Sequence, residues 1–198
     1  MKTILFQGDS ITDMARARDG IGVGYVKYTI EALAEKYPDL QFLNRGVGGN
    51  RTTELVNRWE EDTLSHKPYL VTLLCGINDV WLYFRNNQYT SDEQFEKNYC
   101  YLVESCLNNG SKMILMQPFM FHTGVYKPEF DAELYAKFSI VDKLAEKFQL
   151  PYLRFRDIFN DLTKTNPPEL YTYDGIHLAI EGRKVVAQYL APEIEKLL

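Results

Sequence analysis

Short apolar runs alternate along the chain with segments whose apolar residues recur at helical spacing. Five runs have the length of buried strands and lie at residues 3–7, 40–44, 69–75, 112–117 and 150–155. Helical stripes between them begin at Val26, Leu55, Phe95 and Phe130, and a last helix is predicted for residues 179–197. Strands that alternate with amphipathic helices are typical of a parallel sheet covered on both faces. The pattern predicts an α/β fold, a three-layer α/β/α sandwich with a flavodoxin-like five-stranded parallel sheet.

The length and the even spacing of these elements favour one domain. The chain has 198 residues, and it contains no internal repeat, low-complexity stretch or linker. We therefore predict a single domain over residues 1–198. Ligands of such sheets bind beyond the carboxyl ends of the strands. The loops of interest are those that follow Phe6, Asn44, Cys75, Gln117 and Phe155.

The charge balance narrows the choice of partners. Lys and Arg number 22 and Asp and Glu number 27, which gives a formal net charge of −5. A chain this acidic has no general attraction for nucleic-acid phosphates or anionic membranes. No apolar stretch approaches the roughly 18 residues of a membrane span, and the run after Met1 is too short for a signal peptide. We expect a cytoplasmic protein with no nucleic-acid and no membrane partner.

No motif for a metal or an organic cofactor is present. The three cysteines have no Cys-x-x-Cys spacing and are expected to be small buried residues. His66, His122 and His177 lie far apart and in no metal-binding motif. The glycine-rich segments match neither G-x-G-x-x-G nor G-x-x-x-x-G-K-[ST], which disfavours nucleotide binding. We expect no metal and no cofactor.

A serine follows the first predicted strand, in Gly8-Asp9-Ser10-Ile11-Thr12. A serine at a strand end can present its hydroxyl on a tight turn, and a helix that begins there points its backbone N–H groups at the same place. Ser10 or Thr12 fits equally well as a helix N-cap with no chemical role.

Glycines and an asparagine follow the second and third strands. The segment from Asn44 to Asn50 holds three glycines, which allow a close backbone approach or a positive φ. Asn78 follows the third strand, and its carboxamide can donate to a developing oxyanion. Taken alone, Asn78 is more typical of a turn residue that bonds to nearby backbone.

An aspartate and a histidine lie three positions apart before the last helix, at Asp174 and His177. At this spacing the carboxylate can accept the Nδ1 proton, fix the tautomer and leave Nε2 free as a base. The alternative is a capping aspartate with an incidental histidine. Together with the serine, glycine and asparagine, the pair supplies the groups needed for acyl transfer at one edge of the sheet.

These four segments resemble the blocks of the SGNH (GDSL-type) hydrolase family. Gly8-Asp9-Ser10 is similar to its nucleophile block, and Gly49 occupies the matching place in the glycine block. Gly76-Ile77-Asn78-Asp79 and Asp174-Gly175-Ile176-His177 are similar to its Gly-x-Asn-Asp and Asp-x-x-His blocks. The resemblance implies that Ser10 is the nucleophile and that His177 and Asp174 are its base and orienting carboxylate. It implies an oxyanion hole formed by the backbone N–H groups of Ser10 and Gly49 and by the Asn78 amide.

A narrower resemblance concerns the acetylxylan-esterase-type branch of that family. The segments 11–18, 24–26, 58–62 and 76–81 are similar to that branch. It implies a serine esterase that removes acetyl groups from acetylated xylo-oligosaccharides, and a homo-oligomer. Trp81 and Tyr173 are candidates for substrate contacts, although Trp81 fits core or interface packing equally. Asp9 is a third candidate and also fits a structural role beside Ser10.

Other functions compete with this interpretation. Lipases, lysophospholipases and acyl-thioesterases belong to sibling branches of the same family. Asp9 with Asp174 could form the carboxylate pair of a glycosidase, but the Ser, Asn and His would then have no function. A non-catalytic carbohydrate-binding protein is a further alternative, although all the catalytic residue types are present.

Overall fold

The computed structural model describes residues 2–198 and contains one five-stranded sheet in the order β2-β1-β3-β4-β5. Each neighbouring pair of strands is parallel. This order is that of flavodoxin-like sheets, so the predicted fold class is confirmed. The strands are β1 (Lys2–Gly8), β2 (Leu40–Asn44), β3 (Leu70–Leu74), β4 (Lys112–Met116) and β5 (Tyr152–Leu153).

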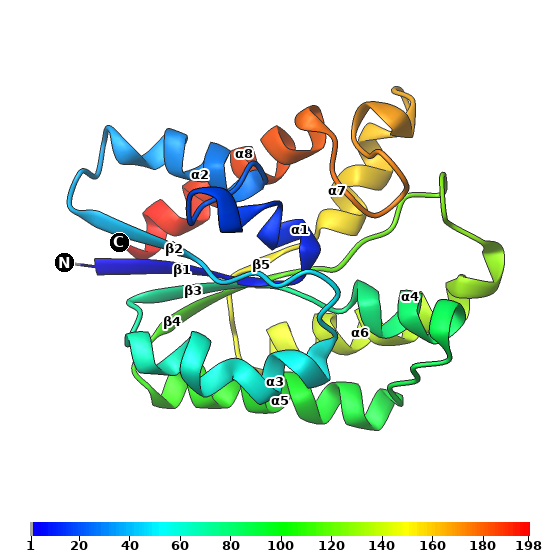
Figure 1. The fold of residues 1–198 in the computed structure, drawn as a ribbon, viewed down its shortest axis with the longest axis horizontal. Coiled ribbons are helices and arrows are strands. Elements are labelled where there is room, and N and C mark those ends of the chain that lie inside the picture. The colour runs from blue at the N-terminus through cyan, green and yellow to red at the C-terminus, as the bar shows by residue number, and fades with distance from the viewer. Residues whose placement is uncertain (1) are drawn as a thin grey trace.

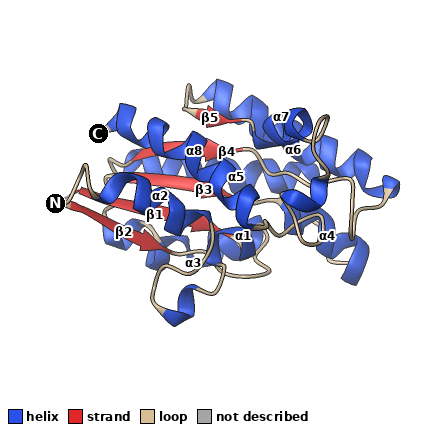
Figure 2. Cartoon of the chain, turned by 90° about the horizontal axis from the view of Figure 1, so that it is seen from above, coloured by secondary structure: helices blue, strands red, loops and turns tan. Residues whose placement is uncertain are grey.

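Helices cover both faces of the sheet (Figure 1, and from above in Figure 2). One face carries α1, α2, α7 and α8, and the other carries α3, α5 and α6. The bounds are α1 (Ser10–Asp13), α2 (Tyr25–Ala34), α3 (Thr52–Asp62), α4 (Ile77–Asn86), α5 (Asp92–Asn108), α6 (Asp131–Lys147), α7 (Phe155–Leu162) and α8 (Ile180–Leu197). None of the helices within residues 2–198 is long and apolar enough to cross a membrane.

The strands are apolar on both sides because each face of the sheet is buried. In β1, Ile4 and Phe6 pack in the core beneath α2 and α8, whereas Leu5 packs in the second core. All three side chains are fully buried. Successive side chains of a strand point to opposite faces, so a strand between two helical layers appears as a continuous apolar run.

Two predicted elements differ from the structure by more than one residue at an end. The last strand was expected at 150–155 but pairs with β4 only through Tyr152 and Leu153. The edge strand is short because α7 begins at Phe155, where Phe155 and Phe159 are buried one turn apart. Residues 77–86 were expected to be a loop and instead form α4.

The sheet brings three of the predicted site loops together. In the sheet, β1 lies between β2 and β3. The segment that connects β2 to β3 therefore takes the chain from one side of β1 to the other. The carboxyl ends of β1, β2 and β3 are therefore adjacent. Ligands of open parallel sheets bind at such a switch in strand order.

Candidate active site

Ser10, His177 and Asp174 form a continuous hydrogen-bonded chain. The Ser10 Oγ lies 2.9 Å from His177 Nε2, and His177 Nδ1 lies 2.7 Å from Asp174 Oδ2. Ser10 is the first residue of α1, and His177 lies in the loop before α8. The imidazole is 39% exposed, so a substrate can approach it. Nucleophile, base and orienting carboxylate are within direct hydrogen-bond reach, which is the geometry of a serine hydrolase.

The loop that carries the aspartate and the histidine is fixed by its own hydrogen bonds. Asp174 Oδ1 accepts from the backbone N–H of Ile176 at 2.9 Å and of His177 at 2.7 Å. The hydroxyl of the buried Thr172 donates to the His177 carbonyl and accepts from the Gly175 N–H, both at 2.9 Å. Burial acts to raise the pKa of the Asp174 carboxyl, but hydrogen bonds from the His177 ring and from the two backbone amides lower that pKa below its ordinary value. The carboxylate is therefore ionised when it orients His177.

Three hydrogen-bond donors are available on the adjoining loops. Ser10 begins α1, so its N–H precedes the helical hydrogen-bond ladder. Gly49 lies at φ +79°, and its N–H has no backbone acceptor within residues 2–198. Asn78, the second residue of α4, uses one amide hydrogen to bond the Asn50 carbonyl at 3.0 Å and keeps the other. These N–H groups are of the kind that stabilises an oxyanion.

Arg58 joins the loops that carry two of these donors. Its guanidinium donates to the carbonyls of Gly8 at 3.0 Å and Arg45 at 2.8 Å, and to Asn50 Oδ1 at 2.6 Å. It also pairs with Asp62 at 3.0 Å. Gly8 lies two residues before Ser10, and Asn50 directly follows Gly49. Arg58 therefore ties the end of β1 to the segment that carries Gly49.

Two buried carboxyl groups support the site without lining it. Asp79 accepts from the N–H and the hydroxyl of Thr52, at 2.9 and 2.8 Å, and so ties α4 to the start of α3. Asp9 is fully buried and caps α1 by accepting from the Ile11 N–H at 2.9 Å. Burial raises the pKa of Asp79 to about 6 and that of Asp9 to about 7. With no exposed surface, Asp9 cannot touch a substrate, which corrects its candidacy for substrate binding and leaves its structural role.

The other two candidate contacts remain accessible. Tyr173 precedes Asp174 and is 64% exposed, and its ring lies 5.5 Å below the Arg183 guanidinium. Trp81 is partly buried on α4, where its indole packs edge-on against Phe130 at 6.0 Å. Phe119 and Phe121, which follow β4, are buried in the core and pack on Phe159 of α7, at 4.9 and 4.8 Å.

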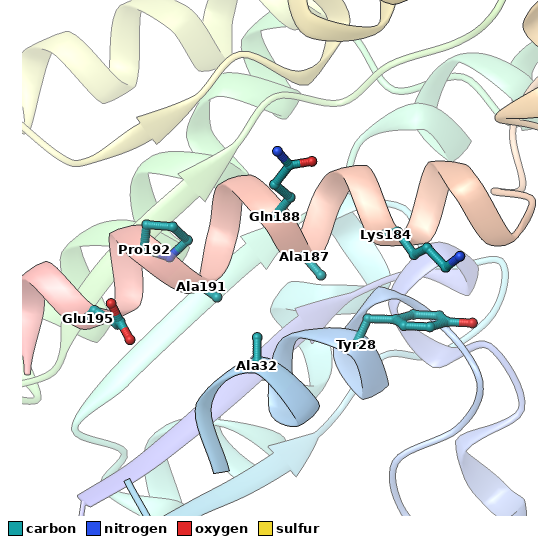
Figure 3. Close-up of a pocket in the computed structure, with 8 residues that line it drawn as sticks. All are labelled: Tyr28, Ala32, Lys184, Ala187, Gln188, Ala191, Pro192 and Glu195. Carbon is teal, nitrogen blue, oxygen red and sulfur yellow. The ribbon is translucent and has the colours of Figure 1, made fainter. Parts of the chain in front are cut away.

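The cavity drawn in Figure 3 lies away from this site. It measures about 410 Å³, and Tyr28 and Ala32 of α2 face α8 across it. No side chain of the serine, histidine and aspartate chain lines it. Within residues 2–198, no group of three or more His, Cys, Asp or Glu side chains is arranged to hold a metal ion.

Two supporting residues carry no signal in the sequence. Thr172 holds the loop of His177, and Asn44 donates to the carbonyls of Thr12 and Ile21, both at 2.7 Å. Thr172 bonds to backbone groups of its own loop and Asn44 to those of a distant segment, and backbone partners form no sequence motif.

Comparison with known proteins assigns the family. Residues 6–185 match the GDSL-like Lipase/Acylhydrolase family. The chain is 32% identical to an acetylxylan esterase of Geobacillus stearothermophilus over 96% of this chain and 93% of the relative. The crystal structure of an acetylxylan esterase from that organism superposes with a TM-score of 0.87 at 30% identity, covering 98% of this chain and 94% of the other. A GDSL-like lipase structure from Parabacteroides merdae gives a TM-score of 0.89 at 29% identity, over 100% and 96% of the two chains. The family match over residues 6–185 and the similarity to this esterase over nearly the whole length show that the chain belongs to the GDSL-like lipase/acylhydrolase family and is a carboxylic ester hydrolase.

Proposed function

We propose that the protein removes acetyl groups from acetylated xylo-oligosaccharides through an acetyl-enzyme formed on Ser10. The observation that carries this proposal is the series of hydrogen bonds that joins Ser10, His177 and Asp174. The protein that holds them is similar to an acetylxylan esterase over nearly its whole length. Solved structures of that esterase include catalytic mutants at a serine, an aspartate and a histidine, the same three residue types.

The first half of the reaction transfers the acetyl group to the serine. Ser10 Oγ attacks the ester carbonyl carbon while His177 Nε2 takes the hydroxyl proton. The oxyanion that forms accepts hydrogen bonds from the N–H groups of Ser10 and Gly49 and from the free amide hydrogen of Asn78. His177 then passes its proton to the sugar oxygen as the bond between that oxygen and the acetyl carbon breaks.

The second half releases acetate. A water molecule attacks the acetyl-serine carbonyl and gives a proton to His177, and the same donors hold the second oxyanion. The bond to Ser10 Oγ breaks, and His177 returns the proton to the serine. Asp174 stays ionised throughout and stabilises the imidazolium, which its lowered pKa favours.

The substrate side of the site rests on two aromatic residues. Trp81 lies one helical turn after Asn78 and Tyr173 directly precedes Asp174, and an aromatic face can pack on the apolar face of a sugar ring. We also expect self-association, which only the resemblance to the acetylxylan-esterase-type branch supports. Size-exclusion chromatography with light scattering measures the oligomeric state.

Acetate release from acetylated xylo-oligosaccharides tests the proposal. We expect rapid release by the wild-type protein, and a loss of nearly all turnover in Ser10→Ala with an unchanged circular dichroism spectrum. Ser139→Ala on α6 is the matched control and should keep full activity. Faster hydrolysis of long-chain esters or acyl thioesters than of acetyl esters would replace the acetyl-sugar substrate with a lipid or thioester.

A further inference from the structure

A cavity outside the Ser10, His177 and Asp174 site is lined by aromatic residues and by positively charged side chains. The cavity measures about 390 Å³ and lies between α4 and the segment that leads from β4 to α6. Its aromatic lining is Trp81 and Phe84 on one side and Tyr126 and Phe130 on the other. Its charged lining residues are both cations, Arg85 and Lys127.

Both walls of this cavity are connected to the catalytic site. Trp81 lies three residues after Asn78 on α4, so the two side chains share one face of the helix, one turn apart. On the opposite wall the Val125 N–H donates to the Asp174 carbonyl at 2.8 Å. Gly124 approaches the same carbonyl so closely that a Cβ would lie 2.1 Å from it. One wall of the cavity is therefore the next turn of the helix that carries Asn78, and the other is a segment bonded to the backbone of Asp174.

The guanidinium of Arg85 is free to bind a ligand. It is exposed and lies 5.8 Å from the centre of the Trp81 ring. Among residues 2–198 no carboxylate lies within 4.0 Å of its guanidinium nitrogens, and the ion pairs of this region are formed by Lys127 and Lys137 instead. Lys127 pairs with Glu129 at 3.7 Å, and both side chains are more than half exposed, so that pair is weak.

This local charge is opposite to that of the whole protein. The chain has a net charge of −5, yet no Asp or Glu lines the cavity. A concave surface of one sign attracts ligands of the other sign. The planar guanidinium matches a carboxylate with two parallel hydrogen bonds, whereas the aromatic faces suit the apolar side of a sugar ring.

We infer that this cavity is a subsite for a carboxylate-bearing sugar, a uronic acid residue attached to the acetylated oligosaccharide. The uronic acid ring packs against Trp81, and its carboxylate binds Arg85. Two helical turns, about 10 Å, separate Arg85 from Asn78 along α4, so the acid occupies a sugar residue next to the acetylated one rather than the acetylated residue itself. This inference rests on the proposed deacetylase function.

The test compares acetylated xylo-oligosaccharides with and without a glucuronic acid side group at low salt. We expect the wild-type protein to have a kcat/KM about three- to tenfold higher for the acidic substrate, through a lower KM, and high salt to reduce this preference. Arg85→Gln should abolish the preference and leave the rates on the neutral substrate and on p-nitrophenyl acetate unchanged. Arg154→Gln is the matched control, because Arg154 also stacks on a ring, that of Tyr152 at 5.7 Å, but lines a different cavity.

The outcomes separate this inference from the proposed function. Equal kcat/KM on both oligosaccharides, or an equal loss on both in Arg85→Gln, overturns the uronic acid subsite while acetate release still supports the deacetylase. No acetate release from either oligosaccharide, with p-nitrophenyl acetate hydrolysed normally, overturns both. Rates that rise with the acyl length of p-nitrophenyl esters and fall in Trp81→Ala would assign the cavity to an acyl chain and overturn the inference.

Discussion

Arg58 offers the most direct way to separate the geometry of the oxyanion donors from the stability of the fold. Its side chain is 16% exposed and donates to the Gly8 carbonyl at the end of β1 and to two groups of the segment after β2, the Arg45 carbonyl and the Asn50 side chain. In Arg58→Lys the ammonium can reach one of these acceptors but has no planar fork to bridge all three. At least two hydrogen bonds from a charged donor are therefore lost.

The size of the effect follows from these contacts. A hydrogen bond to a charged group contributes about 1.5–3 kcal/mol, and partial access to water lowers this value here, so we expect the free energy of unfolding to fall by about 2–4 kcal/mol. Loss of one oxyanion donor reduces kcat by about 10²–10³-fold. Displacing two donors without removing them should reduce kcat by less, about 10- to 100-fold, with little change in KM.

Urea unfolding and initial rates on p-nitrophenyl acetate, both well below the thermal transition, measure the two quantities. Arg45→Lys is the matched control, since Arg45 faces the same Asp62 at 3.9 Å but its side chain bonds to no loop that carries a donor. Added guanidinium ion at non-denaturing concentration should partly restore kcat in Arg58→Ala. A variant that loses stability but keeps the wild-type kcat would show that Arg58 supports only the fold, and the reasoning would be wrong.

Three further changes test the site. In Gly49→Ala the added Cβ meets open space, but the backbone at φ +79° is unfavourable for alanine. We therefore expect the free energy of unfolding to fall by about 1–2 kcal/mol and kcat to fall as well. An unchanged kcat would remove Gly49 from the oxyanion hole. Asp174→Asn keeps the shape of the loop but favours the wrong His177 tautomer, so kcat should fall by about 10⁴-fold, and a loss below tenfold contradicts the assigned role. Burial raises the pKa of Asp9 to about 7, so the native state keeps a proton that the unfolded chain has lost above pH 3.8, and stability declines as the pH rises between those values. Asp9→Asn removes this decline. The difference in unfolding free energy between Asp9→Asn and the wild type should therefore rise by about 2–3 kcal/mol from about pH 5 to pH 8. A difference that does not vary with pH would contradict the raised pKa of Asp9.

The strands were predictable because the sheet is buried on both faces. Residues 40–44 match β2 at both ends, β1 and β3 differ from the expected runs by one residue at each end, and β4 differs by one residue at its carboxyl end only. Helix α4 was missed for a physical reason: its first turn buries Asn78 and Asp79 beside Ile77 and Val80. Polar residues buried to support the site remove the apolar periodicity by which a helix is found in a sequence.

The site was predictable only in its chemistry. Ser10 and His177 were placed together because a serine at a strand end and an Asp-x-x-His segment have few other chemical uses in combination. The burial of Asp9 was not predictable, because no local pattern distinguishes a carboxylate that faces substrate from one that caps a helix. The role of Arg58 at Gly8 and Arg45 depends on carbonyl groups that fold into range from separate loops.

The serine and histidine are 167 positions apart, and this separation has a consequence for folding. The Asp174–His177 loop is fixed by its own short-range bonds, and the donors near Ser10 are fixed by contacts among β1, β2 and β3. These two parts meet when α8 packs beside α2 on the same face of the sheet. Closing so long a chain segment is slow relative to forming its local contacts. Recovery of esterase activity during refolding therefore reports the docking of the last helix, and it should lag behind the return of helical circular dichroism.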